Sequence, residues 1–147
     1  IAEETGAEVI SGHENLGCRI HRVVVGAEPA HRFLQYFGPG VMALIPGDRD
    51  DLVLAAISAQ QVEAGGETAA AICLTSGILP HENIMSIIKR TDMPVIAVKE
   101  GMYAAASRIS DIVAKMSSHE EEKITRAHEL VSKYLDLSAL RERIGLA

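Results

Sequence analysis

Hydrophobic and polar positions along this chain predict strands and helices in alternation. Uninterrupted apolar runs occur at 40–45 (GVMALI), 69–74 (AAAICL) and 93–98 (MPVIAV). Such runs are typical of parallel strands that are buried on both faces. Two further segments, 7–11 and the β-branched 19–27, also predict strands.

Helices are expected between the strands. Gly6 closes a helix at the N-terminus, and Pro29 and Gly38 bracket another, because proline is tolerated in a first helical turn and glycine ends helices. Apolar residues spaced by three and four predict three more helices. Their apolar faces carry Leu52, Val53, Ala56 and Ile57 after Asp50; Ile84, Ile87 and Ile88; and Ile109, Ile112, Val113 and Met116 within 103–116.

The C-terminal residues predict a helical arm. Ser118 and Glu121 fit a capping box, in which each side chain bonds the backbone N–H of the other residue. One apolar stripe follows, made of Ile124, Ala127, Val131 and Tyr134, and a short final helix is expected from Ser138. We therefore expect one domain over 1–147, with an α/β core at 1–116 and a helical arm at 117–147.

Repeated strand–turn–helix units predict an α/β fold, a layered and mostly parallel sheet with flanking helices and right-handed crossovers. Ligands of such sheets gather where strands end and helices begin. Two corners of this kind stand out, PGDRDD at 46–51 and LTSGILP at 74–80.

Composition narrows the class of protein. The chain has 147 residues, enough for one domain with a core, and only 3% are aromatic, so the core must be aliphatic. A net charge of −6 argues against a nucleic-acid partner, and no apolar stretch approaches the ~18 residues of a membrane span. We expect a cytoplasmic domain. Because residue 1 is not methionine, we also expect it to be part of a longer protein.

Catalytic and metal-binding signatures are missing from the sequence. Cys18 and Cys73 form no CxxC pair, and Cys73 lies in an apolar run, which favours a buried structural thiol. The six histidines show neither HxxxH nor HxH spacing, and neither GxxxxGK[ST] nor GxSxG occurs. No catalytic residue, metal or cofactor is predicted.

The PGDRDD corner allows several interpretations. Asp48 is suited to be the N-cap of the following helix, with Asp50 and Asp51 in its first turn, where carboxylates favour the helix dipole. These carboxylates would repel a phosphate. Alternatively they form a cation site, or Arg49 binds an anionic ligand.

Two other clusters are candidates for ligand contact. Thr75 and Ser76 offer hydroxyl groups at the end of a strand, and Gly77 allows the backbone to approach a ligand closely. Tyr103, Ser107 and Arg108 share one face of a helix, which either contacts the ligand or faces solvent. The candidate ligand-binding residues are Asp48, Arg49, Asp50, Thr75, Ser76, Gly77, Tyr103, Ser107 and Arg108.

The chain resembles the DRTGG domain from about Ala7 to Asp136. The resemblance rests on VVVGA, PGDRDD, LTSG, MPVIAV and YAAASRI in this order, and most specifically on Asp48-Arg49 combined with 75–77. The family's Thr-Gly-Gly is Thr-Ser-Gly here, so Ser76 stands where a glycine is expected.

The resemblance implies a fold like that of the HPr kinase N-terminal domain and a role without catalysis. DRTGG domains form the middle part of long bacterial phosphate acetyltransferases, after a dethiobiotin-synthetase-like P-loop region, and accompany CBS domains in some pyrophosphatases. The tail EEEKITRAHELVSKYLD is similar to the acetyltransferase type. We therefore expect a regulatory and dimerisation domain, a homodimer or other homo-oligomer. The alternatives are a sensor of a small metabolite or nucleotide and, third, a stand-alone enzyme.

Overall fold

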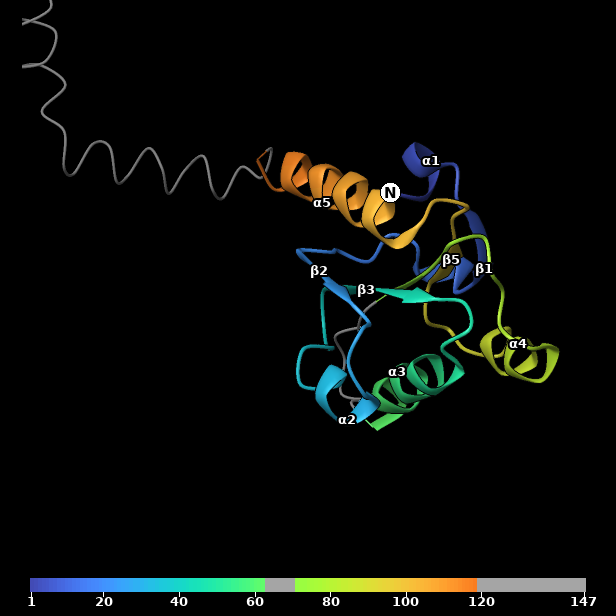
Figure 1. The fold of residues 1–147 in the computed structure, drawn as a ribbon. Helices are drawn as coiled ribbons and strands as arrows, with labels where there is room; N and C mark the ends of the chain where they lie inside the picture. Colours follow the sequence, from blue (N-terminus) through green and yellow to red (C-terminus); the bar gives the residue numbers. More distant parts are fainter. Residues whose placement is uncertain (63–70, 119–147) are drawn as a thin grey trace, which may run out of the picture. The chain divides into compact units, whose positions relative to one another are not determined.

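The computed structural model describes residues 1–62 and 71–118 (Figure 1). One compact unit spans Ile1–Val113. Its elements, in chain order, are α1 (Ala2–Thr5), β1 (Glu8–Ser11), the 3-10 helix η1 (His13–Asn15), β2 (Arg22–Val25), α2 (Ala30–Phe33), β3 (Val41–Pro46), α3 (Asp50–Val62), β4 (Ala71–Thr75), α4 (Glu82–Ile88), β5 (Val95–Ala97) and α5 (Met102–Ser118), of which the last continues past Val113. The predicted capping box and C-terminal helices fall on residues 119–147, outside the described part, so the division at 116/117 stays a prediction.

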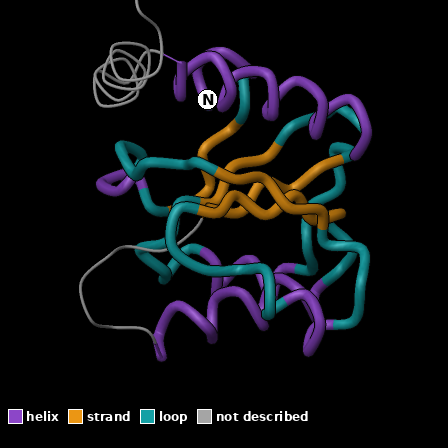
Figure 2. The backbone as a smooth tube through the Cα atoms, turned by 90° about the vertical axis from the view of Figure 1, so that its left-hand side faces the viewer, coloured by secondary structure: helices purple, strands orange, loops and turns teal. Residues whose placement is uncertain are grey.

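The five strands form one sheet in the order β1-β5-β4-β3-β2. Strands β2 to β5 are parallel, and only β1 is antiparallel, pairing Glu8 with Ala97 at the edge of the sheet. The predicted α/β class with a mostly parallel sheet is thus confirmed. Helices lie on both sides of the sheet (Figure 2).

The core has two layers because successive side chains of a strand point to opposite faces. On β3, Ala43 and Ile45 pack toward Leu52 of α3, whereas Leu44 packs on the other face with Ile109 of α5. The five residues Val41 to Ile45 are all buried, which explains the unbroken apolar run.

The predicted buried thiol is present in this core. Cys73 of β4 is fully buried, and burial raises the pKa of its thiol to about 12. It is therefore a packing residue and not a nucleophile at neutral pH.

Some boundaries differ from the sequence prediction. Strand 19–27 shortens to Arg22–Val25, and helix 29–38 ends at Phe33 instead of Gly38. The chain leaves the helix early because Phe37 turns into the core, where its ring stacks on Phe33 with centroids 5.3 Å apart. The helix end at Gly6 is confirmed, since Gly6 adopts the left-handed conformation with φ 64°.

Candidate functional site

The two predicted corners lie side by side at the carboxyl ends of β3 and β4. Pro46 and Thr75, the last residues of these strands, are register partners. The loop after β4 packs against Gly47. A Cβ added at Gly47 would stand 1.7 Å from the carbonyl oxygen of Ile78, which belongs to this loop. The fold thus brings PGDRDD and LTSGILP together.

Arg49 binds within its own corner. Its Nε and Nη2 donate to the two carboxylate oxygens of Asp51 at 2.8 and 2.9 Å, and Nη2 also reaches the carbonyl of Glu28 at 3.3 Å. This bidentate pair lowers the pKa of Asp51, chiefly through the hydrogen bond from Arg49. The guanidinium therefore holds the start of α3 to the loop before α2.

The sequence suggested Asp48 as the N-cap of α3, but the structure places Arg49 at that position. The carbonyl of Arg49 accepts the N–H of Val53 at 3.2 Å, which makes Arg49 the N-cap residue. Asp48 is exposed in the preceding turn. This turn is closed by a hydrogen bond that the N–H of Arg49 donates to the carbonyl of Pro46. Asp50 does lie in the first turn, as expected.

The Thr-Ser-Gly turn has a left-handed backbone at two successive residues. Ser76 has φ 70° and Gly77 has φ 65°, so Ser76 occupies a conformation that favours glycine. The turn is fixed by Ser76 N–H on the carbonyl of Glu100 (2.7 Å) and Gly77 N–H on that of Val98 (3.1 Å). Both amides are therefore engaged.

Two buried polar atoms at this edge have no partner in the described part of the chain. They are Oγ1 of Thr75, whose residue is fully buried, and Oδ1 of Asp50. Neither residue lines the pocket described next, so they are not direct contacts for a ligand there.

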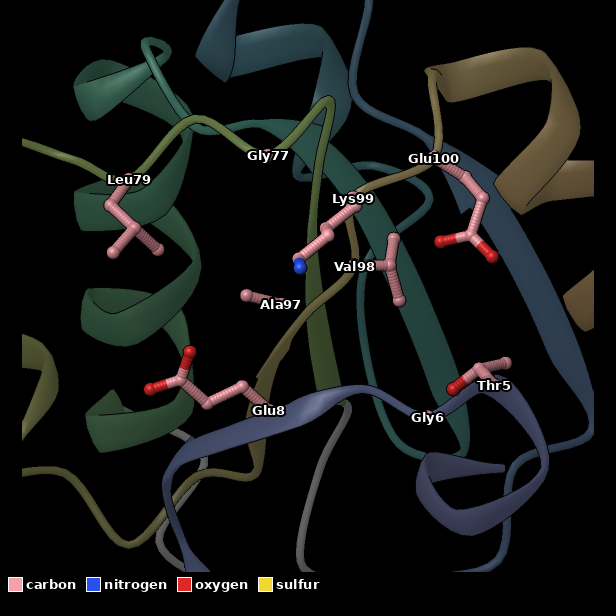
Figure 3. A pocket seen from close by; sticks show the side chains of 9 residues that line it. All are labelled: Thr5, Gly6, Glu8, Gly77, Leu79, Ala97, Val98, Lys99 and Glu100. Atoms are coloured by element: carbon pink, nitrogen blue, oxygen red, sulfur yellow. The ribbon is translucent and has the colours of Figure 1, made fainter.

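A pocket of about 390 Å³ opens at the carboxyl end of β5 (Figure 3). We call it the Lys99 pocket. It is formed by the α1–β1 connection, β5 with its extension, and the loop after β4. Its lining consists of Thr5, Gly6, Glu8, Gly77, Leu79, Ala97, Val98, Lys99 and Glu100.

Charged groups surround the floor of this pocket. Figure 3 shows the Lys99 ammonium and the Glu8 carboxylate on opposite sides of Ala97. The carboxylate of Glu100 is paired within the protein, because its Oε1 accepts a hydrogen bond of 2.7 Å from Nη1 of Arg108. Among the described residues, neither Lys99 nor Glu8 forms an ion pair.

Arg108 stands behind the pocket wall. Besides Glu100, its guanidinium donates to the carbonyl of Thr5 at 3.4 Å and to that of Glu4. It thereby connects α5 to the carboxyl end of α1. Its helix neighbours Tyr103, 88% exposed, and Ser107 face solvent and do not line the pocket.

Of the nine residues predicted from the sequence, Gly77 lines the Lys99 pocket and Arg108 supports it. Their binding roles stay predictions. Sequence reasoning missed Lys99 and Glu8. The one available signal was the position of Lys99 directly after the MPVIAV run, where a strand ends.

No group of three or more His, Cys, Asp or Glu side chains within 1–62 and 71–118 is placed to hold a metal ion. The helices described there are also too short or too polar to cross a membrane.

Comparison with known proteins identifies the family. The model of the DRTGG domain matches residues 1–112, so this chain belongs to the DRTGG domain family. Phosphate acetyltransferases match almost the whole chain: that of Pseudomonas aeruginosa is 29% identical over 99% of it, and that of Nitratidesulfovibrio vulgaris is 26% identical over 95%. The chain spans only about a fifth of these relatives, 21% and 20%. The family predicted from the sequence, a DRTGG domain of the phosphate acetyltransferase type, is confirmed.

A solved structure shares the fold. It contains the CBS and DRTGG domains of the regulatory region of Clostridium perfringens pyrophosphatase, complexed with its activator diadenosine tetraphosphate. The TM-score is 0.58 at 21% identity, covering 72% of this chain and 42% of that one.

Proposed function

We propose that this chain is a non-catalytic regulatory domain of a longer, cytoplasmic phosphate acetyltransferase-like protein, and that it binds a small-molecule ligand in the Lys99 pocket. The observation that carries the proposal is the pocket itself. It lies at the carboxyl edge of the parallel strands, where α/β proteins bind ligands. Its charged groups Lys99 and Glu8 form no ion pair among the described residues.

The chemistry of the lining favours binding over catalysis. The described residues that form the pocket include no histidine, cysteine or serine, and the hydroxyl of Thr5 already donates to the carbonyls of Ile1 and Ala2, so no hydroxyl or thiol nucleophile with an adjacent base is assembled there. The acetyl transfer of the related enzymes is assigned to the four fifths of their length that this chain does not match. Acetyl phosphate formation by the isolated chain would contradict this assignment.

Arg108 supplies a route from the pocket to α5. It joins Glu100, a pocket residue, to a helix that runs to Ser118. A ligand that draws Glu100 or Lys99 toward itself changes the hydrogen bonds around Arg108. Regulation then consists of a shift between two positions of α5, which the ligand favours by its differential affinity.

Binding is tested by thermal shift on the 147-residue chain. The panel holds adenine nucleotides, NADH, pyruvate, acetyl-CoA and the common amino acids, and the variant is Lys99→Met. A ligand that binds the pocket raises the Tm of wild type, because a hundredfold excess over Kd adds about 2.7 kcal/mol to the unfolding free energy. The shift should disappear in Lys99→Met and persist in Lys89→Met, a control on α4's exposed end. A panel without any shift, or shifts equal in both variants, refutes the proposed site.

We further propose a homodimer formed through the edge of the sheet at β2. Val25 and Tyr36 are exposed there, beside a groove of about 290 Å³ that they share with Val24, Glu28 and Phe33. Sedimentation of Val25→Glu should give monomers where wild type gives dimers at micromolar concentration. The control Ile87→Glu, at an exposed apolar residue of α4, should remain dimeric. A monomeric wild type rejects this second proposal and leaves the ligand site untouched.

A further inference from the structure

The positions of Glu8 and Lys99 on the sheet set the spacing of their charges. Glu8 is the register partner of Ala97 on the neighbouring antiparallel strand. The chain continues in line with β5 through Val98, whose N–H donates to the carbonyl of Leu74 at 2.9 Å, and it bends at Lys99 and Glu100. Register partners share a face, so Glu8 and Ala97 lie on one side of the sheet. Figure 3 shows the side chains of Glu8 and Lys99 over the same pocket, on opposite sides of Ala97.

These opposite charges do not close on each other. The structure gives no ion pair between them, and the short side chain of Ala97 leaves open space above the floor (Figure 3). Glu100, the other carboxylate of the pocket, is held by Arg108. The pocket therefore offers one cationic and one anionic contact on opposite sides of a small gap.

We infer that the Lys99 pocket binds a small zwitterion, a molecule with an ammonium and a carboxylate group a few bonds apart, of which α-amino acids are the common class. This inference rests on the proposed function as a ligand-binding domain. The ligand carboxylate pairs with Lys99 and its ammonium pairs with Glu8. Leu79, 49% exposed, provides an apolar wall for an aliphatic substituent.

Phosphorylated ligands fit this pocket poorly. Phosphate sites at turns use free backbone N–H groups, but those of Ser76 and Gly77 already donate to the carbonyls of Glu100 and Val98. Glu8 also places a carboxylate beside the ammonium of Lys99, and the charge of Arg108 is already paired with Glu100. A polyphosphate chain would meet repulsion from Glu8.

Simple ions satisfy only half of the site. Both side chains are exposed, so a monocarboxylate that binds Lys99 gains nothing from Glu8, and an amine that binds Glu8 gains nothing from Lys99. Complementary charges add to affinity and orientation only where each meets its partner. A zwitterion forms both pairs.

The test compares three ligands of one shape: valine, isovalerate and isobutylamine. Their Kd values for the 147-residue chain are measured by NMR titration, together with inorganic phosphate and ATP. Valine should bind at least tenfold more tightly than either single-charge analogue, and phosphate and ATP should be weaker still.

Charge-removing variants then assign the contacts. Glu8→Gln should raise the Kd of valine at least fivefold, to within about threefold of the Kd of isovalerate. Lys99→Met should raise the Kd of valine by a similar factor, to a value close to the Kd of isobutylamine. Glu14→Gln, at an exposed carboxylate outside the pocket, serves as the control and should bind valine as wild type does.

The outcomes separate the inference from the proposed function. If ATP or a lone carboxylate binds most tightly and depends on Lys99, the zwitterion inference fails while the ligand-binding domain stands. Valine binding that survives both variants overturns the assignment to this pocket. If no ligand of the wider panel binds, both fail.

Discussion

The backbone carbonyl of Ile78 lies directly against Gly47, so that a Cβ at Gly47 would stand 1.7 Å from the oxygen. Gly47 is buried by this contact. It joins the corner after β3 to the loop after β4, which begin at the register partners Pro46 and Thr75. The two halves of the family signature are thus one packed unit, in which the glycine is needed for close approach of two backbones.

Gly47→Ala should therefore destabilise the fold strongly. The methyl group meets backbone atoms, which cannot rotate away, so we expect a loss of about 3 kcal/mol or more in the unfolding free energy. Urea denaturation measures it. Gly17→Ala is the matched control, because nothing lies within 4 Å of a Cβ there, and its change should stay within about 0.5 kcal/mol. A Gly47→Ala variant as stable as this control would contradict the contact.

Replacing Ser76 by glycine should maintain or increase the stability of the fold. Its φ of 70° costs an L-residue about 1–2 kcal/mol, against about 0.5–1 kcal/mol for the added chain entropy of glycine. Ser76→Gly should leave stability unchanged or raise it by up to about 1 kcal/mol, and the β-branched Ser76→Val should lower it. Ser58→Gly, in the exposed part of α3, should instead destabilise by up to about 1 kcal/mol. Equal signs for the two glycine variants in urea denaturation would refute the argument.

The central sheet was predictable because burial on both faces leaves a local trace in the sequence. Strands β3 and β4 carry unbroken apolar runs, and each residue from Val41 to Ile45 is buried. Edge strand β2 is less constrained, and there the predicted 19–27 shortened to four residues. The strand order depends on contacts between distant segments, such as Glu8 with Ala97, which a single sequence does not encode locally.

The site was less predictable for the same reason. Sequence reasoning chose Arg49 as a cation that could bind an anionic ligand and Arg108 as part of a polar helix face, yet both guanidinium groups are bound to protein acceptors. Glu8 and Lys99 read as ordinary solvent-exposed charges. Only the antiparallel pairing of β1 with β5 places them around one pocket.

Arg108 should hold α1 on the sheet. Replacing it by methionine removes donors to the carbonyls of Glu4 and Thr5 and unpairs Glu100, for an expected loss of about 1–2 kcal/mol, since the side chain is partly exposed. Hydrogen exchange gives the specific signal: the amides of Thr5 and Ala7, which donate to the carbonyls of Ile1 and Ala2, should exchange faster. Arg32→Met breaks an exposed pair with Glu28 and should not affect these amides. Unchanged exchange in Arg108→Met would remove its clamping role.

Arg49 should control the ionisation of Asp51. The hydrogen bonds from Arg49 hold the pKa of Asp51 below its ordinary value of about 3.9, so the folded state binds this proton less readily than the unfolded chain. The pair therefore stabilises the fold above pH ~4 and loses its effect as the pH falls through the lowered pKa. Because Asp51 is exposed and Arg49 is partly exposed, Arg49→Ala should cost less than about 1 kcal/mol at pH 7.

An NMR titration of the Asp51 carboxyl group tests this directly. Its pKa should rise toward the ordinary value in Arg49→Ala. Glu28→Gln is the control, because Arg49 contacts only the backbone carbonyl of Glu28, and the Asp51 pKa should keep its wild-type value. If the titration of Asp51 is the same in wild type and Arg49→Ala, the bidentate pair does not form in solution, and Arg49 is available for a ligand after all.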